Sequence, residues 1–220
     1  MSKLKDRAIG AINRERILLV FPIKNSQLPK SIWSVLFPRS EMKWEWDEDA
    51  DNRVVQLWHL REELSRSSEV VYAKWYRDRA TFFSREIFPY FLRALNVSER
   101  PRALSREAQN LWDCLEDNSP VATRSLKKAA GLYGRENEAS YQRALKELWQ
   151  RLLIVGFGEK NEGAFPSLQM ASTRLLFEDL WAEAFAMSQV DAFSKLKEWG
   201  FEQDSWTLFL KKLIMKQDDR

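Results

Sequence analysis

The chain has 220 residues, of which 45% are hydrophobic and 13% aromatic, and its formal net charge is +3. This apolar content excludes a disordered chain, and the length suits one large domain or two small ones. No apolar run approaches a membrane span or forms a signal peptide, so we expect a cytoplasmic protein without a membrane partner. The single Cys114 and single His59 exclude an internal disulfide and a Cys/His zinc site, and we expect no cofactor.

In the first half of the chain, apolar spacing predicts helices over residues 5–20, 29–37 and 52–66. The first should stop at Phe21-Pro22, and Pro29 suits the first turn of the second.

Residues 71–76 then alternate with period two, which is typical of a strand. Val71, Ala73 and Trp75 share one face, and Tyr72, Lys74 and Tyr76 share the other. A turn at Arg77-Asp78 would pair Tyr72 with Phe83 in a hairpin, and a helix over residues 85–95 should follow.

The second half repeats this plan after a polar, proline-containing linker over residues 97–105. We expect helices over residues 105–115, 123–130 and 137–152, with Ser105 and Thr123 as the caps of the first two. Two strands should flank the glycine-bearing loop 159–163. Three helices followed by a hairpin is the winged-helix arrangement. The sequence thus predicts a mainly α protein with small β-hairpins: a winged-helix-like unit (1–96), a linker (97–105), a second winged-helix unit (106–172) and a C-terminal helical extension (173–220).

Positive charge is concentrated in the second unit, where residues 123–151 hold seven basic and three acidic side chains. In a helix-turn-helix the second helix is held out so that its exposed face can enter the major groove, and Arg, Lys, Asn and Ser are the side chains that meet phosphates and base edges there. The candidate DNA contacts of this unit are Arg124, Lys127, Lys128, Arg135, Asn137, Ser140, Arg143 and Lys146, with Lys160 in the hairpin loop.

The hairpin of the first unit could act as a second wing, since basic groups bind phosphates and aromatic faces bind sugars or exposed bases. Its candidates are Arg61, Arg66, Tyr72, Lys74, Tyr76, Arg77 and Arg79. The alternatives are a partner-protein surface, a solvated face, and a cover for the acidic segment 45–51, because winged helices also bind proteins and charged faces are usual on surface helices.

Four runs of sequence resemble a known family: WEWDEDAD, LWHLREELSRS, VVYAKWYRDRATFFSRE and LKKAAGLYGRENEASYQRALKELWQRLLIVGFGE. They are similar to the AlkZ-related group of winged-helix proteins, which are themselves similar to the crosslink-repair DNA glycosylases of the AlkZ type. The resemblance covers residues 21–180. It implies a winged-helix protein of DNA-repair type with DNA as its partner, without implying that the glycosylase activity is shared.

The chain departs from the AlkZ glycosylases, which are longer, have three winged-helix units and position the hydrolytic water with a Gln-x-Gln or Gln-x-Asp motif. No Gln-x-Gln occurs here: Gln56-Leu57-Trp58 ends in a residue that cannot accept a proton from water, and Gln189-Val190-Asp191 falls in the C-terminal tail. We therefore expect a DNA-binding protein without catalysis, with a DNA glycosylase as the alternative. Its weak catalytic candidates would be Gln56, His59 and Glu63, in a cleft between the units that Glu62 and Lys74 also line.

Overall fold

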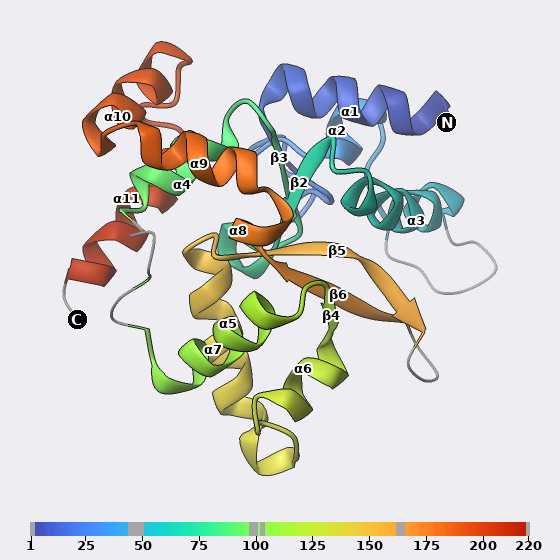
Figure 1. Cartoon of the computed structure of the whole chain (residues 1–220). Helices are drawn as coiled ribbons and strands as arrows, with labels where there is room; N and C mark the ends of the chain where they lie inside the picture. Colours follow the sequence, from blue (N-terminus) through green and yellow to red (C-terminus); the bar gives the residue numbers. More distant parts are fainter. Residues whose placement is uncertain (1–2, 44–50, 97–100, 102–103, 162–165, 219–220) are drawn as a thin grey trace.

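The computed structural model describes residues 3–43, 51–96, 101, 104–161 and 166–218 (Figure 1). The described chain is mainly helical and carries one six-stranded antiparallel sheet. Figure 1 shows this sheet through the middle of the molecule, with α1, α2 and α3 at one end and α5, α6 and α7 at the other.

The two halves of the chain repeat one order of elements: helix, strand, helix, helix, strand, strand. The first half consists of α1 (Lys3–Glu15), β1 (Ile17–Leu19), α2 (Ile32–Leu36), α3 (Asn52–Arg66), β2 (Val70–Ala73) and β3 (Thr81–Ser84), with the short 3-10 turn η1 (Tyr76–Asp78) between its last two strands. The second half consists of α5 (Arg106–Asp117), β4 (Val121–Ala122), α6 (Thr123–Ala129), α7 (Glu138–Gln150), β5 (Ile154–Asn161) and β6 (Pro166–Ser172), with the 3-10 turn η2 (Arg135–Asn137) before α7.

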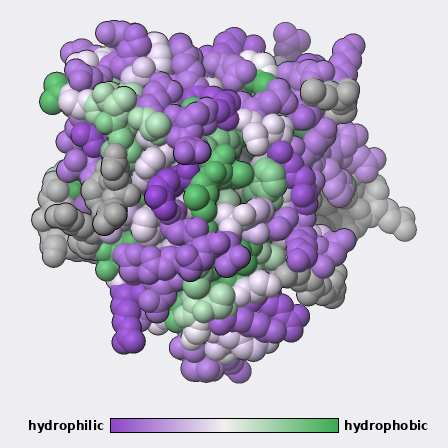
Figure 2. Space-filling model, in the orientation of Figure 1, coloured by the Kyte–Doolittle hydropathy of each residue, from purple (hydrophilic) through white to green (hydrophobic). Residues whose placement is uncertain are grey.

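The remaining helices lie between and after these halves. They are α4 (Phe88–Ala94), α8 (Thr173–Leu176), α9 (Glu178–Ala186), α10 (Gln189–Glu198) and α11 (Ser205–Asp218). Figure 2 shows that hydrophilic side chains cover most of the face seen in Figure 1, with hydrophobic residues gathered near its centre.

The strand order β1-β3-β2-β5-β6-β4 makes each half contribute three strands, and the halves join where β2 pairs with β5. Tyr72 lies opposite Gly156 at this junction. A Cβ atom on Gly156 would overlap the Tyr72 ring, so the close approach of the two halves requires a glycine there.

Both faces of β2 are buried. Val71, Ala73 and Trp75 belong to a core shared with α4, α5 and α7, as the alternation predicted. Tyr72, on the other face, is 1% exposed in a second core with α1, α2 and α3.

Two helices follow the sequence prediction closely. Helix α3 spans residues 52–66 and is capped by the Asp51 carboxylate, which accepts from the Arg53 amide. Ser105 caps α5 by accepting from the Ala108 amide at 3.3 Å, as predicted. The Thr123 cap is wrong, because Ala122 occupies the cap position and the Thr123 hydroxyl donates to the Leu168 carbonyl at 3.0 Å.

Other predicted boundaries also need correction. The helix over residues 5–20 is too long: α1 ends at Glu15, and the following apolar residues form β1, whose Ile17 pairs with Phe83. The predicted hairpin is shifted by one residue, since Tyr72 pairs with Phe82. The cause is the connection, which is the 3-10 turn η1 with Arg77 and Asp78 at positive φ rather than a two-residue turn. Most of the predicted linker lies outside the described residues.

Helix α11 is held against the end of β2 by aromatic side chains. The Trp206 ring lies 4.8 Å from Tyr76, and the Phe209 ring lies 5.1 Å from Trp75. Trp75 in turn donates its indole N–H to the carbonyl of Gln150, the last residue of α7, at 3.2 Å. One aromatic cluster therefore holds α11, β2 and α7 together.

Candidate nucleic-acid interface

Helices α6 and α7 form a pair with buried inner faces. Leu126 of α6 and Tyr141, Leu145 and Leu148 of α7 are at most 8% exposed. These apolar positions recur at helical spacing along α7, which leaves the opposite side of the helix for polar residues.

Most of the basic side chains predicted on this pair point to solvent. Those classed as exposed are Arg124, Lys128, Arg135, Arg143 and Lys146. Tyr133, which the sequence analysis did not single out, is 52% exposed in the connection, and the Lys128 amine lies 5.5 Å from its ring centre. The surface thus offers phosphate-binding groups beside one aromatic face.

Two of the predicted contacts are engaged inside the pair instead. Lys127 forms an ion pair with Glu138 at 2.6 Å and lies 4.5 Å from the Tyr141 ring centre. Hydrogen bonds from Gln142 and Lys127 lower the pKa of Glu138. The Asn137 amide donates to the Tyr133 carbonyl at 3.2 Å. These residues shape the connection between the helices.

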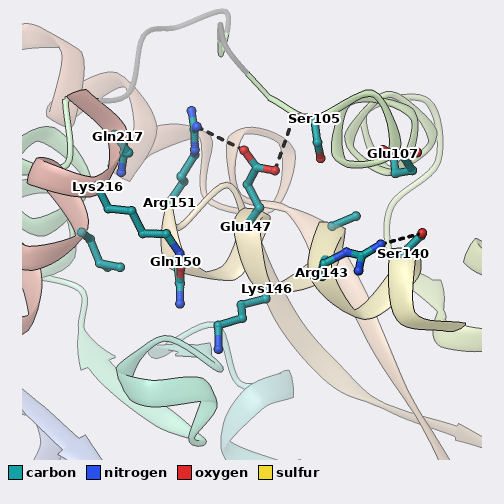
Figure 3. A pocket seen from close by; sticks show the side chains of 12 residues that line it. Ser105, Glu107, Ser140, Arg143, Lys146, Glu147, Gln150, Arg151, Lys216 and Gln217 are labelled. Atoms are coloured by element: carbon teal, nitrogen blue, oxygen red, sulfur yellow. Dashed lines mark hydrogen bonds and ion pairs between the residues drawn. The ribbon is translucent and has the colours of Figure 1, made fainter. Parts of the chain in front are cut away.

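A pocket of about 440 Å³ lies where α7 meets the start of α5 and the end of α11 (Figure 3). The predicted contacts Ser140, Arg143 and Lys146 line it. So do polar residues that sequence reasoning missed: Ser105, Glu107, Glu147, Gln150, Arg151, Lys216 and Gln217. Sequence spacing could not predict that Lys216 lines this pocket, because the aromatic cluster is what holds α11 beside α7.

The pocket contains a fixed ion pair. Arg151 and Glu147 lie 3.2 Å apart, and each side chain is only 10% exposed. The Ser105 amide donates to the other Glu147 oxygen at 3.3 Å, so this carboxylate is held from two sides. Arg143 donates to the Ser140 hydroxyl at 3.1 Å, and Lys146 forms an ion pair with Asp78 of η1.

The wing predicted in the first half is largely unable to meet a ligand. Both tyrosines are buried: Tyr72 is covered by α1, α2 and α3, and Tyr76 is covered by α11. Arg61 is also buried and is paired with Glu159 of β5. Arg66 donates to the Glu62 carboxylate and to the Glu159 carbonyl. The predicted contact role of the two tyrosines is therefore wrong for this arrangement.

The other candidates of this region differ in accessibility. Arg77 and Arg79 are exposed, and so is Lys160 on β5, whereas Lys74 is half-buried. The Arg77 guanidinium lies 5.2 Å from the Tyr76 ring centre.

The weak catalytic candidates do not meet in a pocket. Gln56 and His59 are exposed on α3, and Glu63 is half-buried. None of these three residues lines the 440 Å³ pocket or a second one of about 270 Å³ beside α2. The predicted cleft between the units is occupied instead by the packing of α3 against β5, through Arg61, Arg66 and Glu159.

Trp58 is a further accessible group that sequence reasoning did not propose as a contact. It is 45% exposed on α3, and the Arg61 guanidinium lies 4.3 Å from its ring centre.

Among the described residues, no helix is both long and apolar enough to cross a membrane. Within the same residues, no group of three or more His, Cys, Asp or Glu side chains is placed to hold a metal ion.

Comparison with known proteins agrees with the resemblance of the sequence runs. A family model described as AlkZ related matches residues 4–203. No curated protein and no solved structure matches the chain. Because the family model spans most of the sequence, the chain belongs to the AlkZ-related family.

Proposed function

We propose that the protein binds DNA through the exposed face of α6 and α7, as a non-catalytic, DNA-repair-associated member of its family. The observation that carries the proposal is the set of exposed basic side chains on this helix pair: Arg124, Lys128, Arg135, Arg143 and Lys146. Lysine and arginine contacts to phosphates supply most of the affinity of such an interface.

The order of elements supports two winged-helix units. In each half, the hairpin of the second and third strands follows three helices, and the first strand, which lies between the first two helices in the chain, pairs with the third strand. A helix-turn-helix followed by a hairpin has this order, and α6 with α7 would be the DNA-binding pair of the second unit. We assign the first unit to residues 1–96 and the second to residues 106–172, with residues 173–220 as a helical extension.

The surroundings of α7 favour a shallow mode of binding. Lys146 is tied to Asp78, and the end of α11 stands beside Arg151 and Gln150 in the pocket. The open part of α7 is therefore its N-terminal half, together with η2 and α6. Contacts from this surface to the DNA backbone would give affinity with little dependence on sequence.

The proposal is tested by fluorescence anisotropy with random-sequence duplex DNA at several salt concentrations. We expect affinity to fall steeply with salt and to differ little between duplexes. The double variant Lys128→Ala/Arg135→Ala should bind about tenfold or more weakly and lower the salt slope by about 2, since each phosphate contact contributes about 1. Lys197→Ala, an exposed residue of α10, is the matched control and should bind like the parent.

Three outcomes would change the assignment. Selection of one strong palindrome, preferred by about a thousandfold or more, would favour a transcriptional regulator. Absence of binding even at low salt would favour a protein-interaction module. Release of bases from alkylated or crosslinked DNA, lost in Gln56→Ala or Glu63→Ala, would make the protein a glycosylase.

A further inference from the structure

The pocket beside α7 has a wall that comes from outside the helix pair. Leu213, Lys216 and Gln217 of α11 form it, and these residues follow the region matched by the family model. Trp206 and Leu210, earlier on the same helix, are buried, and Trp206 contacts Tyr76. The wall is therefore anchored to the rest of the molecule, and Figure 3 shows Lys216 reaching from it toward Gln150 of α7.

The cations of the pocket fall into two classes. Arg151 is paired with Glu147, and Lys146 is paired with Asp78. Arg143 and Lys216 have no carboxylate partner among the described residues, and both are exposed. They come from different helices, and both line this one cavity.

The neutral groups of the pocket are suited to the same anion. Gln150 and Gln217 carry amide donors, and Ser140 carries a hydroxyl that already contacts Arg143. The volume of about 440 Å³ lies within the range of small-molecule sites, roughly 300–1,000 Å³. A concave site of this size suits a chain end better than the continuous backbone of a duplex.

We propose that this pocket binds the phosphomonoester at the end of a DNA strand. This inference rests on the proposed function, since it assigns a ligand to a cavity beside the proposed DNA-binding face. A terminal phosphate carries a charge of about −1.5 to −2, against about −1 for an internal phosphodiester, so two unpaired cations favour it. Arg143 would hold two of its oxygens through its planar fork, and Lys216 would supply the second charge.

Glu107 is the one lining carboxylate without a cationic partner among the described residues, and it opposes an anion. Its removal should tighten the binding of a terminal phosphate. The variant Glu107→Gln therefore tests the sign of the electrostatic argument without disturbing Arg143 or Lys216.

The test compares short single-stranded oligonucleotides, labelled internally, that carry a 5′-phosphate, a 3′-phosphate or hydroxyl groups at both ends. We expect at least one phosphorylated strand to bind about tenfold more tightly than the hydroxyl strand. Arg143→Ala and Lys216→Ala should remove this preference, and Glu107→Gln should increase it a few-fold. Lys212→Ala, an exposed neighbour on α11 outside the pocket, should keep it.

Equal affinity for the phosphorylated and hydroxyl strands would overturn the inference, as would a preference that survives in Lys216→Ala. The variant Lys128→Ala separates this inference from the proposed function, because it should weaken all strands alike and keep the preference. If the protein binds no DNA, a deoxynucleoside 5′-monophosphate and its nucleoside, compared by calorimetry, still test the pocket. Tighter binding of the monophosphate, lost in Lys216→Ala, would then support the inference alone.

Discussion

Lys74 is half-buried at the junction of the two halves, beside Arg61 and Glu159. Burial, and then the positive charge of Arg61, lower the pKa of its amine, while Glu159 acts in the opposite direction. The strand alternation predicts Lys74 on the same face as Tyr72, but only the packing of α3 against β5 shows that Tyr72 is covered.

The lowered pKa of Lys74 predicts a pH-dependent effect of Lys74→Met. The Lys74 amine keeps its proton up to a pH of about 10.4 in the unfolded chain, whereas the folded protein releases it at lower pH. Between its folded and unfolded pKa the unfolded chain binds more protons, so a rise in pH there stabilises the folded protein. At neutral pH the variant avoids a half-buried charge, and its free energy of unfolding should exceed that of the parent. Urea unfolding at neutral pH and near pH 10 should show this gain shrink as the pH rises. A gain that does not change with pH would contradict the explanation.

The Arg61–Glu159 ion pair predicts a larger effect on stability. Their side chains are only 9% and 15% exposed, so Glu159→Gln would leave the Arg61 charge without its counter-ion. Loss of one partner from a buried pair costs about 3 kcal/mol. The control is Glu198→Gln in α10, whose side chain is 63% exposed beside Lys195, and it should cost less than about 0.5 kcal/mol. Similar losses in the two variants, measured by urea unfolding, would show that the pair adds nothing beyond a surface contact.

At the scale of elements, the predictable parts are those that local sequence specifies. Helix α5 was predicted from its Ser105 cap and its stripe of apolar residues, and α3 was predicted from its apolar stripe, without its Asp51 cap. The strand β1 was not predicted, because three apolar residues directly after a helix fit a continuation of that helix as well as they fit a strand. What decides between them is the pairing with β3, which lies far along the chain.

The β2–β5 junction predicts that the sheet tolerates no side chain at Gly156. In Gly156→Ala the new methyl group would overlap the Tyr72 ring, so the strands must separate or the ring must move, at a cost of about 1–3 kcal/mol. Gly10 in α1 has open space around its Cα, and Gly10→Ala should raise stability by about 0.5–1 kcal/mol. Thermal unfolding of both variants checks the prediction. An unchanged Gly156→Ala protein would mean that the halves do not meet closely at this point.

For the whole molecule, the candidate site was partly predictable. The basic face of α6 and α7 follows from helical spacing alone, and most of its predicted residues are exposed. The pocket cannot be predicted from helical spacing. Lys216 and Gln217 line it because Trp206 and Phe209, on the same helix, pack against Tyr76 and Trp75. Tyr72 and Tyr76 were assigned to a ligand for the same reason, since sequence alternation cannot show that distant helices cover both faces of a strand.

Hydrogen exchange of the amides with and without DNA tests most directly whether α6 and α7 hold DNA. The measurement uses the full chain with an excess of random-sequence duplex at low salt, and Lys128→Ala/Arg135→Ala serves as the weak-binding control. We expect slower exchange over residues 123–146 in the parent, reduced protection in the variant, and no change over α10 (Gln189–Glu198) in either. Protection confined to α1 and α3, or equal protection in parent and variant, would contradict DNA binding by α6 and α7.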